Sequence, residues 1–182
     1  MKLAALRLRQ RDGTTCGPSV AVVAAALLDP KYRAALSDSV SGPDRGSAWF
    51  ASEQSRVHAE VNRFWPRTLG TTPVGIARAF NTHGAVLGMR YRWRLFRGRR
   101  DTLTDVLRSV EAGRPVAMLV GRFIPRHWVL IVDMAGVEVS GRELHCYEPS
   151  SGEVRMVGAD SVRRSRLTGL GYPRPFAFVL PR

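Results

Sequence analysis

The feature that most constrains this chain is an abrupt change from a polar, turn-forming segment, "LRQRDGTT", to a long apolar run, "CGPSVAVVAAALL". Pro18 suits the first turn of a helix, because its missing N–H would have no partner there. We therefore expect a helix from Gly17 to about Leu28, ended by "DP". Cys16 stands at the start of this helix, where unpaired N–H groups and the backbone dipole favour negative charge. The change in polarity is also expected to lift the thiol out of the core.

The rest of the chain has helical patterns first and strand patterns later. Helices are expected over residues 48–65, over 73–84 with Thr72 as the N-cap, and over 101–113. The segment "AVLGMRYRWRLF" reads as a strand between the last two helices. Further short strands are expected in "PVAMLVGRF", "HWVLIVDM", "VEVSG", "ELHCYEP", "EVRMV" and "PFAFVLP", with a brief helix near 159–164. This order predicts an α+β fold with a mostly antiparallel sheet.

Length and composition favour one domain over residues 1–182. The 182 residues have the usual size of a single domain, and 45% apolar content is enough to build one core. The apolar stretch at the N-terminus is far too short for a signal peptide, and no segment approaches the ~18 apolar residues of a membrane span. A soluble cytoplasmic protein is expected.

Cysteine usage bears on cofactors and on redox chemistry. Cys16 and Cys146 are the only cysteines in the sequence. Two thiols in a chain of this length do not form a disulfide framework, and the paired motifs of a zinc site are missing. We expect no metal and no cofactor.

A catalytic cysteine needs a base within hydrogen-bond reach, and four histidines are candidates. His58 lies in a charged part of a helix and is interpreted as a surface residue. His83 stands at a helix end, and His145 lies in the middle of a strand. His127 follows the loop "RFIPR" and begins the most hydrophobic strand, so it can face a cleft while the strand holds it. His127 is therefore the predicted base.

A third group has to orient the imidazole, and an oxyanion needs donors. Asp133 lies on the same strand as His127 and is ~20 Å away at ~3.3 Å per residue, too far to touch it. Glu148 ends the strand that returns beside His127, and it is the predicted orienting residue. The side-chain amide of Gln10 and the N–H of Cys16 are the predicted oxyanion donors.

The segments "QRDGTTCG", "HWVLIVD" and "YEPSSG", in this order, resemble the papain-like cysteine peptidases that remove double-glycine leader peptides from bacteriocin precursors, and their stand-alone relatives. The resemblance covers most of the chain. It implies a papain-like fold in which the helix of the nucleophile packs on the sheet. It also implies that Cys16 is the nucleophile, His127 the base and Gln10 the oxyanion donor. The family usually has Asp where this chain has Glu148, which is a methylene longer.

The function indicated is hydrolysis of a peptide bond through an acyl-enzyme, with a peptide or protein as substrate. Two alternatives stay open. One is a weak or inactive peptidase-like domain that binds a peptide without cutting it. The other is an acyltransferase, in which an amine replaces water as the acceptor of the same thioester.

The net charge of +13 comes almost entirely from arginine and would attract anions, including acidic peptides. The segment "RYRWRLFRGRR" mixes arginine with aromatic residues, as nucleic-acid sites do. Its alternation argues against nucleic acid, because in a half-buried strand Tyr91, Trp93 and Leu95 would face inward and the arginines would face water. No exposed stacking platform is then expected.

Overall fold

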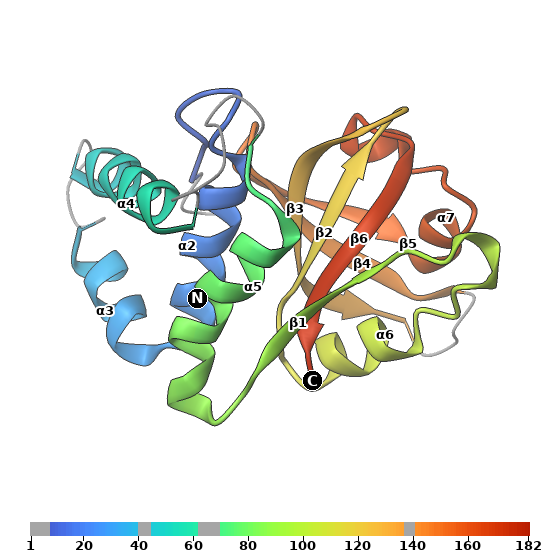
Figure 1. Cartoon of the computed structure of the whole chain (residues 1–182), viewed down its shortest axis with the longest axis horizontal. Coiled ribbons are helices and arrows are strands. Elements are labelled where there is room, and N and C mark those ends of the chain that lie inside the picture. The colour runs from blue at the N-terminus through green and yellow to red at the C-terminus, as the bar shows by residue number, and fades with distance from the viewer. Residues whose placement is uncertain (1–7, 40–44, 62–69, 137–140) are drawn as a thin grey trace.

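A six-stranded antiparallel sheet lies between two groups of helices (Figure 1). The computed structural model describes residues 8–39, 45–61, 70–136 and 141–182. On one side of the sheet lie α2 (Cys16–Leu28), α3 (Pro30–Ser39), α4 (Arg45–Val61) and α5 (Pro73–Gly84), and on the other lie α6 (Thr104–Glu111) and α7 (Ala159–Arg163). Short 3₁₀ turns cover η2 (Ala85–Leu87), η3 (Gly98–Arg100) and η5 (Thr168–Leu170). The fold is α+β.

The strands are β1 (Tyr91–Leu95), β2 (Val116–Gly121), β3 (Pro125–Ala135), β4 (Glu143–Glu148), β5 (Glu153–Gly158) and β6 (Arg174–Pro181). Their order in the sheet is β1-β6-β2-β3-β4-β5, and each neighbouring pair is antiparallel. Most of the strand "VEVSG" and the end of the helix expected over 48–65 fall outside the described residues. Within the described part of the chain, no helix has the length and apolar character needed to cross a bilayer.

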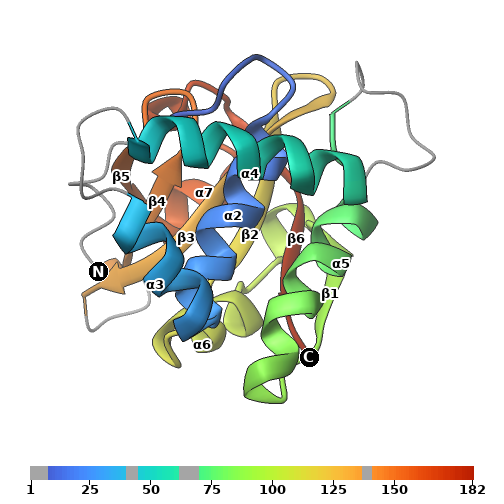
Figure 2. The same ribbon diagram turned by 90° about the vertical axis from the view of Figure 1, so that its left-hand side faces the viewer.

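Helix α2 occupies the centre of the helical layer. All of its residues except Leu27 are buried, because α3, α4 and α5 cover it on one side and β3 on the other. Figure 2 shows α4 crossing in front of α2. A helix that is apolar all round is stable in water only when neighbours surround it in this way. The apolar run of the sequence thus places Cys16, the first residue of α2, between the helices and the sheet.

Two apolar cores lie on the two faces of the sheet, and β2 contributes to both. Ala117 and Leu119 belong to the core shared with α2, α4 and α5, whereas Val116, Met118 and Val120 belong to the core shared with α6 and α7. Alternate side chains of a strand point to opposite faces. Since helices cover both faces, β2 has no polar positions at all.

The expected stop of α2 at Asp29-Pro30 is confirmed, and the same two residues also start another helix. Pro30 is the first residue of α3, and Asp29 caps it: its Oδ1 accepts hydrogen bonds from the N–H groups of Lys31 at 2.9 Å and Tyr32 at 3.3 Å. "DP" is compatible with a helix end and also with an N-cap followed by proline. The sequence prediction took the first meaning, whereas the structure has both, with no loop between α2 and α3.

The expectation that the apolar residues of β1 face inward is wrong beyond Tyr91. Trp93 is 43% exposed and Leu95 is 64% exposed, while Arg94 is partly buried. Arg94 forms ion pairs at 2.6 Å with both Asp101 and Asp105. Trp93 and Arg94 are neighbours in the strand, so they point to opposite faces of the sheet and the alternation holds. Because β1 is an edge strand, Trp93 and Leu95 stay incompletely covered, whereas Asp101 and Asp105 hold Arg94.

Candidate active site

His127 connects two of the other predicted site residues. Its imidazole interacts with the side chain of Cys16, which raises the pKa of His127, and its Nε2 lies 2.7 Å from Oε1 of Glu148. Since Nε2 faces the carboxylate, Nδ1 is the ring nitrogen left for the sulfur. The structure thus places the imidazole of His127 between the thiol of Cys16 and the carboxylate of Glu148.

The register between β3 and β4 places His127 within reach of Glu148. Leu130 pairs with Tyr147, so the next step of the ladder sets Val129 opposite Glu148. His127 is then a diagonal neighbour of Glu148, at a separation that only a long side chain crosses. The glutamate side chain spans this offset, since its Oε1 lies 2.7 Å from Nε2 of His127.

The turn after β4 holds the carboxylate of Glu148. The N–H of Ser150 donates to Oε1 at 2.9 Å, and the N–H of Ser151 donates to Oε2 at 2.8 Å. Burial by itself would raise the pKa of Glu148, but the hydrogen bonds from His127, Ser150 and Ser151 outweigh it and hold this pKa far below its usual range. Glu148 is therefore ionised and fixed in direction.

The charge of His127 follows from its two partners. Burial lowers the pKa of His127, but the hydrogen bonds with Cys16 and Glu148 outweigh it and raise this pKa to about 9. The ring is consequently an imidazolium near neutral pH. Positive charge beside a cysteine favours the thiolate, which is the nucleophilic form.

Tyr172 is a further residue at this site, and the sequence prediction did not include it. Its ring stacks on the imidazole of His127, with centroids 5.3 Å apart and planes 24° from parallel. Tyr172 lies just before β6, far from His127 along the chain. The sequence shows only a tyrosine in the turn "GYPRP", which carries no sign of such a contact.

Gln10 lies beside the turn that holds Glu148. Its N–H donates to the carbonyl of Pro149 at 2.7 Å, and its side-chain Nε2 donates to the carbonyl of Asp12 at 2.8 Å. An amide nitrogen carries two hydrogens, so this bond leaves the second for another acceptor. The role of Gln10 as an oxyanion donor stays a prediction.

Gln54 on α4 holds the backbone on both sides of Gln10, a contact that the sequence did not reveal. Its Oε1 accepts from the N–H of Arg11 at 2.9 Å, and its Nε2 donates to the carbonyl of Arg9 at 3.2 Å. Gln54 is buried. A polar residue buried on a helix and bound only to a remote backbone fixes the position of that backbone.

The thiol does not stand out of the core as expected. Cys16, His127 and Glu148 are 3%, 4% and 5% exposed. A cavity of about 140 Å³ reaches the thiol, and it is lined by Cys16, Gly70, Thr71, Thr72, Pro73, Leu119, Pro125, Arg126 and Trp128. The segment before α5 covers the first turn of α2, and the indole N–H of Trp128 donates to the carbonyl of Thr71 at 2.8 Å.

Gly17 allows this close approach. A Cβ at Gly17 would lie 2.7 Å from both Cβ and Oγ1 of Thr71, closer than non-bonded atoms pack. The glycine after Cys16 therefore has a steric reason: it lets the segment of Thr71 lie against the start of α2.

The remaining histidines lie elsewhere. His58, expected on the surface, is 3% exposed because its side of α4 packs inward. Nδ1 of His83 lies 3.3 Å from Oδ2 of Asp29, and Nδ1 of His145 lies 3.9 Å from Oδ2 of Asp133. Of the four histidines, His127 is the one that lies beside both Cys16 and Glu148.

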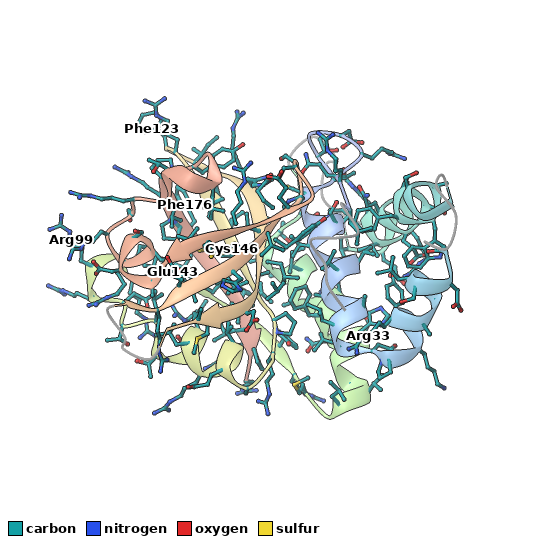
Figure 3. All side chains as sticks on the ribbon, turned by 180° about the vertical axis from the view of Figure 1, so that it is seen from behind. Arg33, Arg99, Phe123, Glu143, Cys146 and Phe176 are labelled. Atoms are coloured by element: carbon teal, nitrogen blue, oxygen red, sulfur yellow. The ribbon has the colours of Figure 1, made fainter. Side chains whose placement is uncertain are left out.

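Cys146 lies within the sheet (Figure 3), in the core on the face opposite to that of Cys16. Burial raises the pKa of Cys146 to about 12, which leaves it an unreactive thiol. No group of three or more His, Cys, Asp or Glu side chains in the described ranges could hold a metal ion.

Comparison with models of known protein families finds no match, and comparison with curated proteins finds no significant match. The geometry of Cys16, His127 and Glu148 therefore carries the functional argument.

Proposed function

We propose that this protein is a papain-like cysteine peptidase that hydrolyses a peptide bond through Cys16, His127 and Glu148. The observation that carries the proposal is the position of His127, which interacts with the Cys16 side chain and whose Nε2 lies 2.7 Å from the Glu148 carboxylate. The buried nucleophile helix packed on an antiparallel sheet supports it. The order of "QRDGTTCG", "HWVLIVD" and "YEPSSG", which resembles that of the double-glycine leader peptidases, supports it further.

The residues take complementary parts in the reaction. The thiolate of Cys16 attacks the carbonyl carbon, and collapse of the tetrahedral intermediate breaks the C–N bond as His127 gives its proton to the leaving amine. A water molecule then attacks the thioester while His127 takes up its proton. Collapse of this second tetrahedral intermediate breaks the C–S bond, which releases the acid and restores the thiolate of Cys16 and the protonated His127. Glu148 orients the ring and stabilises its charged form throughout.

Two donors serve the developing oxyanion. Cys16 is the first residue of α2, so its backbone N–H has no partner inside the helix. The side-chain amide of Gln10 supplies the second hydrogen bond. Gln54 maintains the segment of Gln10 next to the site through its bonds to Arg9 and Arg11.

Alkylation by iodoacetamide near neutral pH tests the thiol first. We expect Cys16 to react faster than free cysteine, and His127→Ala to remove the acceleration. Cys16→Ala should leave the protein unlabelled, since Cys146 is 0% exposed and burial raises its pKa to about 12. Slow labelling that does not depend on His127 would contradict the proposal.

Peptide cleavage tests the reaction itself. The protein is incubated with a proteome-derived peptide library, and new termini are detected by mass spectrometry against Cys16→Ala as the control. A reactive thiol with no cleavage would point to the binding-domain alternative. Products that carry an added amine in place of water would point to acyl transfer.

Nucleic-acid binding is a second candidate, favoured by one observation. Trp93 is 43% exposed on β1 with the exposed Arg92 beside it. Quenching of tryptophan fluorescence by single-stranded DNA, with a steep salt dependence and loss in Trp93→Ala, would support this candidate. The neighbouring Arg94 is already neutralised by Asp101 and Asp105, so it offers little to a phosphate.

A further inference from the structure

The cavity beside Cys16 has the size of one side chain. Its volume of about 140 Å³ is close to the ~150 Å³ of an engineered protein cavity that binds benzene. Leu119 and Trp128 form apolar walls, and both are buried. Pro73 and Pro125 add further apolar surface. A group that enters this cavity next to the thiol therefore loses much of its contact with water.

Among the described residues that line this cavity, Arg126 is the only one with a charged side chain. It is exposed and directly precedes His127 in β3. Within the described part of the chain, its guanidinium has no ion pair and no hydrogen bond. An arginine at the edge of an apolar cavity, without a counter-charge, favours an anionic ligand.

Some arginines of the protein differ in this respect. Carboxylates in the described ranges neutralise six of them: Arg11, Arg56, Arg94, Arg142, Arg155 and Arg164 each have an acidic partner within 4.0 Å. Among the described residues that line the cavity, no acidic side chain does the same for Arg126. A substrate carboxylate would fill that role.

The hairpin between β2 and β3 fixes where Arg126 enters the site. A Cβ at Gly121 would overlap the carbonyl of Ile124, so this glycine permits a tight return of the chain. Phe123 projects from the tip of this hairpin, away from the body of the protein (Figure 3), and is 77% exposed. Arg126 therefore stands at the base of the hairpin, next to the reactive pair.

We propose that the cavity selects an acidic side chain, with glutamate the best fit, at a substrate residue close to the bond that is cut, and that Arg126 is the specificity-determining residue. The methylenes of glutamate would lie on the apolar walls, and its carboxylate would accept hydrogen bonds from the Arg126 guanidinium. This inference rests on the proposed peptidase function and names its substrate class.

Matched electrophilic peptides test the inference on the full-length protein. The probes are acetyl-dipeptide chloromethyl ketones with Glu, Gln or Lys at either of the two residues before the electrophile, the other residue being Gly. The rate of Cys16 labelling is followed by intact-mass spectrometry. Glu and Gln have nearly the same shape, so their ratio reports charge alone.

We expect the wild type to react with the Glu probe about fivefold faster than with the Gln probe at one of the two positions, which is at the upper end for an exposed ion pair. Arg126→Gln should abolish the preference, and Arg126→Glu should shift it to the Lys probe. Arg122→Gln is the matched control, because Arg122 lies on the same hairpin, next to Phe123, and does not line the cavity. It should keep the preference for Glu.

Iodoacetamide separates failure of this inference from failure of the proposed function. Equal rates with Glu and Gln probes at both positions, together with fast and His127-dependent alkylation by iodoacetamide, would overturn the inference and leave the peptidase proposal standing. Slow alkylation that is independent of His127 would overturn both. A Glu preference that survives in Arg126→Gln and disappears in Arg122→Gln would assign the specificity to Arg122 and overturn the inference.

Discussion

The carboxylate of Glu148 lies 2.7 Å from Nε2 of His127 and also accepts backbone N–H groups from its own turn. Its position and charge are therefore set before any substrate arrives, and it holds the imidazole with one nitrogen toward Cys16. Glu148 therefore acts on the site by holding the imidazole of His127 in position. Measurements of activity and of folding on single variants separate this orienting effect from loss of the fold.

Cys16→Ala and His127→Ala should each lower kcat/KM by at least about 10³-fold, because they remove the nucleophile and the proton carrier. Glu148→Gln should cost less, about 10²-fold, since an amide can still accept a hydrogen bond from the ring. Peptide cleavage and circular dichroism measure activity and folding together. Equal losses in all three folded variants would contradict a purely orienting role for Glu148.

Activity should persist up to about pH 9 and fall above it, because the pKa of His127 is raised to about 9 by its bonds to Cys16 and Glu148 against the effect of burial. Glu148→Gln removes the charge that helps to raise this pKa. The alkaline limb of the kcat/KM profile should then move to lower pH. An unchanged limb would show that the charge of Glu148 is not coupled to His127.

The same pair should affect stability within a defined pH range. The pKa of His127 is raised above 6.5 on folding, so its contribution is complete below that pH and is lost as the pH rises through about 9. The pKa of Glu148 is lowered from 4.5, so its contribution is present above that value and is lost in acid. The destabilisation caused by Glu148→Gln in urea unfolding should be largest between pH 4.5 and 6.5.

Gly17→Ala should destabilise the fold by about 2 kcal/mol, because its Cβ would press on Thr71 and α2 cannot move within its packed surroundings. Gly13→Ala is the matched control, since a Cβ at Gly13 meets no atom within 4 Å. Urea unfolding measures both variants. Equal stabilities would show that the segment of Thr71 moves aside at little cost.

Tyr172→Ala should lower kcat/KM by roughly threefold to tenfold, the effect of losing an aromatic contact to a charged ring. It should also move the alkaline limb to lower pH, because the stacked ring helps to stabilise the imidazolium of His127. Tyr172→Phe keeps the stacking and should behave like the wild type. A loss of stability in Tyr172→Ala without any shift of the pH profile would indicate a packing role only.

Gln54→Leu should lower kcat about tenfold, an effect of the size expected when hydrogen bonds to Arg9 and Arg11 are lost and the Gln10 segment shifts. KM should change little, because an oxyanion donor acts in the transition state. Gln54→Glu keeps the acceptor for the Arg11 N–H, so its kcat should lie between that of the wild type and that of Gln54→Leu. A lower stability with unchanged kcat would separate Gln54 from the function of Gln10.

Local patterns predicted much of this architecture because they depend on neighbours along the chain. The start of α2 at Cys16, the Thr72 cap of α5 and the order of helices before strands follow from proline, capping and alternation, and the structure confirms them. Local chemistry was ambiguous at Asp29, which both ends α2 and caps α3.

Local patterns did not predict the placement of side chains that depends on contacts with residues far away in the sequence. Trp93 is exposed because it lies on the edge strand β1, where its face of the sheet is incompletely covered, and His58 is buried because α4 lays it against other helices. Tyr172 and Gln54 reach the site from segments that show no motif, and their contribution depends on where the chain returns in space.

The sequence by itself determined the chemical groups of the candidate site and the helix end that presents Cys16, since both depend on residue type and local spacing. Only the tertiary structure decided that the thiol is enclosed, that Tyr172 and Gln54 support the site, and that Arg126 stands beside the cavity. These depend on the register of β3 with β4 and on the packing of α2 beneath the Thr71 segment, where the free energy comes from contacts between residues far apart in the chain.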